Sequence, residues 1–405
     1  MIKMIPLKQV CTDIVDCPHE SPKWLSEGIP IVRNFNLIDG QIDMSDAYYV
    51  DEPTYQKRTQ RAVPSSGDII FSREAPIGNC AIVPPNFKCC LGQRLVLLKV
   101  NSEICSPDYL LAALLSDFVK SQIAQVEKRG SIVSNFNIGD LKDLLIPIID
   151  TQESVASISK KIYRKLALNK HLCNELEALA KTIYDYWFTQ FDFPDDEGKP
   201  YRSSGGEMVW NEQLKREIPK GWDAGQLSDI ANITMGQSPS GESYNEDGEG
   251  TVFYQGCTDF GTRFPEPRVY TTAPTRYAKA GDILMSVRAP VGTINIAMED
   301  CCIGRGLAAL NSKSGSQLYL LYTLSGFKQL FDVMDGNGTT FGSITKDTLF
   351  EMKVVVPKNE LLKTFEKIVQ PIEKRIRATE QENRELTKLR DWLLPMLMNG
   401  QARVE

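Results

Sequence analysis

The chain has 405 residues, a net charge of −6 and a sequence pI near 5.3. Its hydrophobic fraction of 42% and charged fraction of 24% are typical of a globular protein. No apolar run approaches the about 18 residues that a membrane span needs, so we expect a cytoplasmic protein of two or three domains. The excess of acidic residues argues against a chain that binds DNA tightly by itself, because phosphate binding needs clustered Lys and Arg.

Cysteine and histidine are placed in a way that does not favour a metal site. The chain has 10 cysteines and 2 histidines, and no two cysteines have the C-x-x-C spacing of zinc or redox motifs. Two vicinal pairs occur, at residues 89–90 and 301–302. We interpret the cysteines as small buried hydrophobic residues in a reducing compartment, and we expect no bound metal.

The first predicted domain covers residues 1–150. Short apolar runs bounded by Gly, Pro and Asn, such as residues 29–32 and 95–98, predict strands. An amphipathic helix is predicted at residues 107–126. A long spacer helix follows at residues 151–192; its part from residue 151 to 187 would be about 50 Å long at ~1.5 Å per residue.

The remainder of the chain repeats this order. A polar, turn-rich connector is predicted at residues 193–222, followed by a second domain at 223–358, a second spacer helix at 359–400 and a short tail at 401–405. The fold class is therefore α+β, with two tandem mixed domains of strands and helices, each followed by a long helix.

Internal similarity supports this duplication. Two segments around Gly67 and Gly281 resemble each other at a separation of 214 positions, and the two vicinal cysteine pairs lie 212 positions apart. A third similarity, at a separation of 210 positions, relates residues 145–147 to residues 355–357. The drift is small, so the chain consists of two related halves.

Apolar residues recur in both long helices at the a and d positions of a heptad, which predicts an antiparallel, coiled-coil-like pair. The alternative is that each helix packs separately on its own domain. A polar residue in such a seam commonly fixes the register. The predicted pairing residues are Ile158, Ile162, Asn169, Leu172, Leu176 and Leu179 in the first helix, and Ile368, Ile372, Leu386 and Leu389 in the second.

Each half carries loops that suit DNA contact, because Arg and Gln can read base edges and Gly allows close approach to phosphate. The alternative for any one of them is an ordinary surface loop with salt-bridged arginines. The candidate DNA-binding residues are Arg73, Gln93, Arg94, Lys128, Arg129 and Ser131 in the first half, and Arg288, Arg305, Thr339 and Thr340 in the second.

Motifs for catalysis are not found. Residues 336–342 imitate a nucleotide-binding loop, but their spacing fits neither a Walker loop nor a dinucleotide fingerprint. Asp347, Glu351 and Lys353 resemble a nuclease carboxylate set only loosely, and solvated charges explain them as well. We therefore predict no catalytic residue in this chain.

The connector and both helix ends resemble the specificity subunits of type I restriction-modification systems, over nearly the whole chain. The resemblance is carried by residues 176–180, 186–188, 191–194, 198–201, 203–206, 218–222, 281–284, 289–292 and 389–401. It implies two target-recognition domains that each read one half of a split DNA site, and helices that set the spacing.

The same resemblance implies partners. The helices would bind two methyltransferase (modification) subunits, which use S-adenosylmethionine to methylate adenine, and motor-nuclease (restriction) subunits would add ATP- and magnesium-dependent restriction. This chain itself would bind double-stranded DNA, no cofactor and no membrane.

Other hypotheses remain open at this point. A stand-alone DNA methyltransferase or nuclease would need cofactor or metal motifs. A protein-interaction scaffold would agree with the acidic pI. A specificity subunit could also serve a modification-only system, and the sequence does not distinguish this from a restriction system.

Overall fold

The computed structural model describes residues 2–74, 76–127, 136–336, 342–399 and 401–402. The chain forms two compact units. The first unit contains residues 1–174 and 377–405, and the second contains residues 175–376. Each unit therefore combines one strand-rich domain with a part of both long helices.

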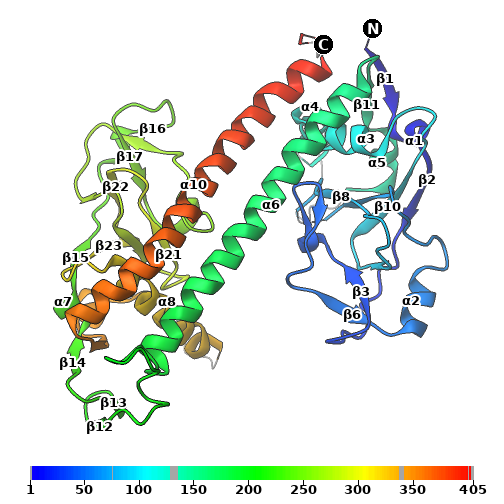
Figure 1. Cartoon of the computed structure of the whole chain (residues 1–405). Helices are drawn as coiled ribbons and strands as arrows, with labels where there is room; N and C mark the ends of the chain where they lie inside the picture. The colour runs from blue at the N-terminus through cyan, green and yellow to red at the C-terminus, as the bar shows by residue number, and fades with distance from the viewer. Residues whose placement is uncertain (1, 75, 128–135, 337–341, 400, 403–405) are drawn as a thin grey trace. The chain divides into compact units, whose positions relative to one another are not determined.

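The first unit is built on a four-stranded antiparallel sheet (Figure 1). Its strands, in spatial order, are β2 (Cys11–Asp16), β10 (Leu95–Val100), β7 (Ile69–Ser72) and β8 (Cys80–Ile82). All four residues of β7 are buried. Since successive side chains point to opposite faces of a strand, Ile69 and Phe71 belong to one core cluster while Ile70 belongs to another.

Helices cover one face of this sheet and close the larger core cluster. Ser106 accepts a hydrogen bond from the backbone N–H of Tyr109 at 3.2 Å and caps α3 (Pro107–Leu114), with proline at the first helical position. The other helices of the domain are α1 (Leu7–Val10), α2 (Glu52–Arg58), α4 (Asp117–Glu127) and α5 (Ile138–Asp143). An antiparallel pair of β1 (Lys3–Pro6) and β11 (Leu145–Ile148) joins the two ends of the domain.

A smaller sheet completes the first domain. Its order is β6 (Tyr48–Val50), β3 (Ile29–Val32) and β9 (Cys90–Leu91), and β3 runs parallel to β9. A short ribbon of β4 (Leu37–Ile38) and β5 (Gln41–Ile42) lies next to β8.

The second unit repeats the main sheet with the same strand order. It contains β15 (Ala231–Met235), β23 (Leu307–Ser312), β20 (Ile283–Ser286) and β21 (Ile294–Ile296). The pair β14 (Asp223–Gln226) and β24 (Lys353–Val356) corresponds to β1 and β11, and the helices are α7 (Leu227–Ile230), α8 (Gln317–Gly336) and α9 (Lys346–Phe350).

The second unit also has a second sheet, which contains five strands where its counterpart in the first unit contains three. Its order is β16 (Tyr244–Asn245), β18 (Tyr270–Thr271), β17 (Thr251–Tyr254), β22 (Cys301–Ile303) and β19 (Tyr277–Ala278). Here β17 runs parallel to β22, as β3 does to β9. The predicted α+β duplication is confirmed by these matching topologies.

One detail of the predicted repeat is wrong. Tyr109 donates its hydroxyl hydrogen bond to the carbonyl of Pro147 at 2.5 Å, and Tyr319 donates to the carbonyl of Val355 at 2.6 Å. These equivalent bonds make Val355 the counterpart of Pro147 in the repeat. The separation is therefore 208 positions and not 210. Because strand side chains alternate with a period of two, a slip of two residues leaves the apolar pattern unchanged and cannot be detected from it.

The vicinal cysteines lie at equivalent places in the two smaller sheets, with Cys90 in β9, Cys89 directly before it, and Cys301 and Cys302 in β22. Cys89 and Cys90 belong to different core clusters, because neighbouring strand residues point to opposite faces. Burial raises the pKa of the Cys89 and Cys301 thiols to about 12, so they stay protonated at neutral pH. All cysteines except Cys257 are buried, as small hydrophobic residues would be.

The two long helices are α6 (Gln152–Tyr184), which continues as a π-helical turn at Asp185–Thr189, and α10 (Asn359–Met398). In the first unit, Asn169 of α6 donates a hydrogen bond to Glu382 of α10 at 2.9 Å, and Lys165 forms an ion pair with the same carboxylate at 3.0 Å. Arg390 lies 5.8 Å from the ring of Tyr163, so numbering rises on one helix as it falls on the other. The helices run antiparallel, and α10 lies beside α6 (Figure 1).

The predicted pairing residues are only partly buried. Ile162 and Asn169 are buried, whereas Ile158, Leu172, Leu176, Ile372 and Leu386 are half-buried. The prediction is wrong for Leu179, Ile368 and Leu389, which are 50%, 44% and 43% exposed. A straight helix drifts by about 20° per heptad against a strict repeat, and these helices also pack on the domains, so the buried line departs from the heptad positions. It includes Tyr163, Leu166, Cys173 and Ala180 in α6, and Phe365, Val369, Ile376 and Thr379 in α10.

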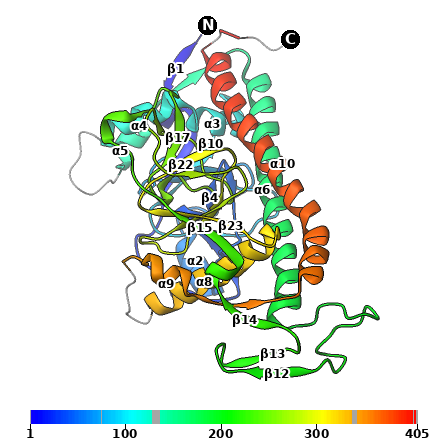
Figure 2. The same cartoon turned by 90° about the vertical axis from the view of Figure 1, so that its left-hand side faces the viewer.

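Aromatic side chains pack the start of the connector against its end. Phe193 stacks on Trp222, with ring centroids 5.0 Å apart, and Phe191 meets the edge of the same indole at 5.6 Å. Asp192 accepts hydrogen bonds from the backbone and hydroxyl of Ser203, which lower the pKa of this carboxyl. The hairpin of β12 (Met208–Asn211) and β13 (Arg216–Pro219) lies beyond β14 (Figure 2).

Candidate nucleic-acid interface

Three segments of the first unit meet where β7 ends and β10 begins, and we call this place the first junction. It consists of the loop residues 73–74 and 76–79, the loop residues 92–94, and Phe136. Arg73 donates its backbone N–H to the carbonyl of Arg94 at 2.9 Å, and Phe136 donates to the carbonyl of Arg73 at 2.9 Å. Because β7 and β10 are antiparallel neighbours, the end of one lies beside the start of the other. Two of the loops that carry candidate DNA-binding residues are thus brought together.

The second unit builds the same arrangement, the second junction, from the loop 287–293, the loop 304–306 and Ile344. Val287 donates its backbone N–H to Gly306 at 2.9 Å, and Ile344 donates to the carbonyl of Val287 at 2.9 Å. These bonds correspond one for one to those of Arg73 and Phe136. The two junctions are therefore equivalent places on equivalent sheets.

The loop that follows β7 in the first junction has the same shape as the loop that follows β20 in the second. Ser72 donates its hydroxyl hydrogen bond to the carbonyl of Glu74 at 2.8 Å, and Ser286 donates to the carbonyl of Arg288 at 2.5 Å. Gly78 and Gly292 close the turns with positive φ angles of 88° and 80°, which favour glycine. The repeated serine and glycine thus fix loop shape, while the residues between them differ.

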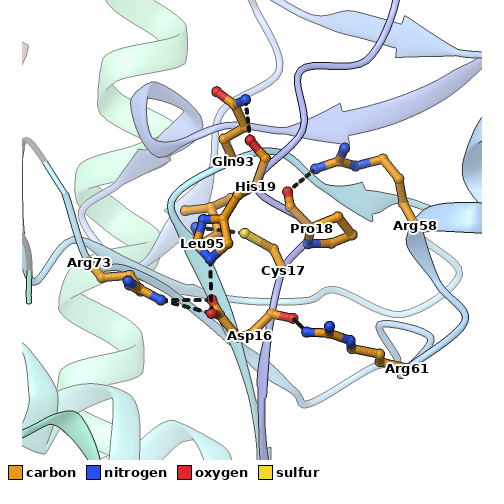
Figure 3. A network of polar contacts seen from close by, with 9 residues as sticks. All are labelled: Asp16, Cys17, Pro18, His19, Arg58, Arg61, Arg73, Gln93 and Leu95. Atoms are coloured by element: carbon orange, nitrogen blue, oxygen red, sulfur yellow. Dashed lines mark hydrogen bonds and ion pairs between the residues drawn. The ribbon is translucent and has the colours of Figure 1, made fainter. Parts of the chain in front are cut away.

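Arg73 does not face solvent, which corrects its assignment as a direct DNA contact. Its side chain is buried, and Nη1 donates to both carboxylate oxygens of Asp16 at 2.9 Å (Figure 3). His19 lies 3.1 Å from the same carboxylate. This partly buried ion pair holds the junction loop against the end of β2.

Gln93 is hydrogen-bonded within the protein. Its amide donates to the carbonyl of His19 at 2.5 Å (Figure 3). It also donates to the hydroxyl of Ser21 at 2.8 Å, so it fixes the segment that follows β2. Arg58 binds the same segment, donating to the carbonyl of Pro18 at 3.0 Å and to that of Glu20 at 2.8 Å. No sequence pattern points to Asp16 or Arg58, because their partners are backbone groups or lie far along the chain.

The second unit replaces the buried ion pair with apolar residues. Val287 stands at the position of Arg73, and the strand registers place Met235 at the position of Asp16. Both members of the pair have changed together, so no buried charge is left without a partner. This is the pattern expected where an ion pair and a hydrophobic contact serve the same packing role.

The remaining described candidates are exposed at the junctions. Arg94 has a positive φ of 69° and forms an ion pair with Glu74 at 2.9 Å. Arg288 and Arg305 are exposed in the second junction. A Cβ atom on Gly304 or Gly306 would approach Gln255 within 2.7 Å, so glycine is required on both sides of Arg305.

Five candidates, Lys128, Arg129, Ser131, Thr339 and Thr340, lie outside the described residues. Phe136 in the first junction and Gly342 in the second stand directly after those segments; Gly342 accepts a hydrogen bond from Ala289 at 3.2 Å. Across the described part of the chain, no group of three or more His, Cys, Asp or Glu side chains could hold a metal ion. Nor does any helix there have the length and apolar character to cross a membrane.

Comparison with known proteins identifies the family. The family described as "Type I restriction modification DNA specificity domain" matches residues 5–178 and 219–388, one copy in each half. The type I restriction enzyme MjaX specificity subunit of Methanocaldococcus jannaschii is 32% identical, over 93% of this chain and 88% of the relative. The HindI specificity subunit of Haemophilus influenzae is 22% identical, over 83% of this chain and 86% of the relative.

A solved structure supports the fold. The type I restriction-modification S subunit from M. genitalium aligns with a TM-score of 0.57 and 19% identity, covering 97% of this chain and 95% of that one. This likeness supports the fold of two similar domains with two long helices. The catalytic activities of this family's systems reside in other subunits. The chain therefore belongs to the type I restriction-modification DNA specificity family, and it is a specificity subunit with two target-recognition domains.

Proposed function

We propose that each recognition domain reads one half of a bipartite DNA target through its junction, and that the paired helices set the distance between the halves. The observation that carries this proposal is that the same junction occurs in both recognition domains. The backbone hydrogen bonds of Arg73 and Phe136 recur at Val287 and Ile344 with the same length, whereas the exposed side chains differ. A shared scaffold with different side chains suits two different half-sites.

The exposed arginines supply the chemistry of recognition. An arginine can donate two hydrogen bonds to the edge of guanine in the major groove, and it can also bind phosphate. Arg94 in the first junction and Arg288 and Arg305 in the second are exposed, which supports this role for them. The buried Arg73 and the hydrogen-bonded Gln93 would act indirectly by fixing the loop that presents Arg94.

An alanine substitution of both Arg288 and Arg305 tests this role. We expect DNA binding to weaken by about tenfold to hundredfold, because one bidentate base contact contributes about 1–3 kcal/mol. The melting temperature should not change, since both side chains are exposed. Fluorescence anisotropy with the methylation complex and its target duplex would measure the affinity.

The matched control is Arg268→Ala in the same unit, because Arg268 is exposed and pairs with Asp259 at 2.8 Å outside the junction. Equal affinities for the double variant and the wild type would show that the second junction does not face DNA.

The partners in this proposal are two methyltransferase subunits, which bring S-adenosylmethionine, and motor-nuclease subunits, which bring ATP and magnesium. Support comes from exposed apolar residues on both helices. Leu179 of α6 and Leu389 of α10 are separated by the 210 positions that relate the two helix ends, and they are 50% and 43% exposed. Trp392, one turn from Leu389, is 63% exposed. Equivalent exposed leucines on two helices suit two copies of one partner.

Aspartate at Leu179 or at Leu389 should each weaken the binding of one methyltransferase subunit. We expect about a tenfold or greater loss for each, because burial of a leucine side chain contributes about 1.5–3 kcal/mol. Native mass spectrometry of the complex would count the bound subunits, with Val63→Asp, at a 50% exposed position in the first recognition domain, as control. Full occupancy in both leucine variants would place the partner elsewhere.

A further inference from the structure

A loop of the second recognition domain reaches both long helices through one arginine. The carbonyl of Arg263 accepts a hydrogen bond from Ile296 of β21 at 2.9 Å, so the backbone belongs to the recognition domain. Its side chain is 6% exposed; Nη1 donates to Glu177 of α6 at 2.8 Å and Nη2 donates to Glu373 of α10. The guanidinium also lies 5.8 Å from the ring of Tyr322 in α8. One residue thus joins the recognition sheet to both helices of the pair.

The equivalent loop of the first recognition domain carries the opposite charge. There Ile82 of β8 donates its backbone N–H to the carbonyl of Gly40 at 3.3 Å, which places Gly40 at the position of Arg263. The neighbouring Asp39 lies 3.7 Å from Arg390 of α10, and Asp43 lies 3.1 Å from Lys170 of α6. In this unit the recognition domain supplies the carboxylates and the helices supply the cations.

The two sets of contacts differ in burial as well as in sign. Arg263 is enclosed, and its two carboxylates compensate a charge that would otherwise be costly to bury. Burial alone would lower the pKa of Arg263, but Glu373 and Glu177 outweigh that effect and raise it, so the side chain stays charged. By contrast, the Asp39 and Asp43 side chains are 55% and 28% exposed. The second domain therefore depends on its ion pairs more than the first.

We infer that ion pairs of opposite polarity assign each recognition domain to its own part of the helix pair, and that Arg263 is a positioning residue for the second domain. Either domain placed on the other's helix segments would bring like charges together: Asp39 and Asp43 against Glu177 and Glu373, or Arg263 against Lys170 and Arg390. Such juxtaposition opposes wrong docking. Arg263 would thus fix where the second junction stands relative to the helices.

This inference rests on the proposed function for its consequence in DNA recognition. A recognition domain that shifts on its helices would accept targets whose gap is one base pair longer or shorter. A domain that merely folds less well would lower methylation of all targets in the same proportion. The ratio of methylation rates on off-gap and native-gap duplexes therefore separates positioning from stability.

The test uses the full chain in complex with its methyltransferase subunit. The variants are Arg263→Glu, Arg263→Lys, and a charge-reversed triple variant that combines Arg263→Glu with Glu177→Arg and Glu373→Arg. We expect Arg263→Glu to raise the off-gap ratio about tenfold, since it places three carboxylates together. Arg263→Lys should have a smaller effect, because lysine cannot hold two carboxylates in the arginine fork geometry. The triple variant should return the ratio to within about twofold of the wild type.

Arg268→Glu is the control, an exposed arginine in the same unit with its own carboxylate partners. If Arg263→Glu does not fold, Arg263→Lys and the triple variant still report the ratio. An unchanged ratio in Arg263→Glu and Arg263→Lys, or a triple variant that remains as impaired as Arg263→Glu, would overturn the inference.

A wild-type complex that shows no fixed gap would refute the proposed function instead. Hydrogen exchange would then decide the inference by itself. Faster exchange in residues 260–265, with unchanged protection of β20 and β23, is expected for Arg263→Glu. Identical exchange in the wild type and this variant would overturn it.

Discussion

Replacement of residues 1–150 by the equivalent domain of another specificity subunit will change one half of the methylated DNA motif and leave the other half and the gap unchanged. The reason is that the first junction is built entirely within this domain, from Arg73, Arg94 and Phe136. Each mismatched base pair costs about 1–3 kcal/mol, so a half-site of three altered pairs should lower methylation of the original target at least ~100-fold. Long-read mapping of methylated adenines would reveal the new motif.

The donor domain must carry acidic residues at the places of Asp39 and Asp43, so that the ion pairs with Lys170 and Arg390 are kept. The reciprocal exchange of residues 223–358 is the matched control and should change the other half-site. A motif in which both halves change after one exchange would contradict the independence of the two recognition domains.

Insertion of one heptad into both helices at matched places will lengthen the gap between the half-sites. The places are after Leu172 in α6 and after Ala378 in α10, between the Asn169–Glu382 contact of the first unit and the Arg263 contacts of the second. One heptad adds ~10 Å of helix, which corresponds to about three base pairs of B-DNA. The half-sites should not change, because neither junction is altered.

The control for this prediction is the insertion in α6 alone, which moves the α6 contacts of one unit by a heptad against α10. We expect this variant to lose stability without a defined new gap. Methylation mapping of both variants would test the ruler role of the helices, and an unchanged gap in the matched insertion would contradict it.

The duplication could be predicted from the sequence because it is expressed in local patterns. Glycine and serine recur at turns that require them, as at Gly78 and Gly292, and the repeated spacing follows from the shared fold. The register of the last strand pair could not be predicted, because a slip of two residues preserves the pattern of inward and outward side chains.

The candidate site could be predicted only as a set of loops. Arg73 was predicted to contact DNA because the sequence alone does not distinguish an exposed arginine from a buried one. Its burial depends on Asp16, which is 57 positions away and belongs to the neighbouring part of the sheet. Arg263 was missed for the same reason, because its partners Glu177 and Glu373 are 86 and 110 positions away.

The same limit applies to the helix faces. Heptad positions marked Leu179, Ile368 and Leu389 as seam residues, but burial along these helices also depends on the domains that pack on them. The exposed leucines are better candidates for partner contact than for helix pairing.

The most direct test of the specificity role is to co-express this chain with its methyltransferase subunit and to map methylated adenines across a genome by long-read sequencing. We predict a single split motif with a fixed gap, and its loss when this chain is omitted. Methylation that does not depend on this chain, or no motif under conditions where the complex forms, would contradict the account.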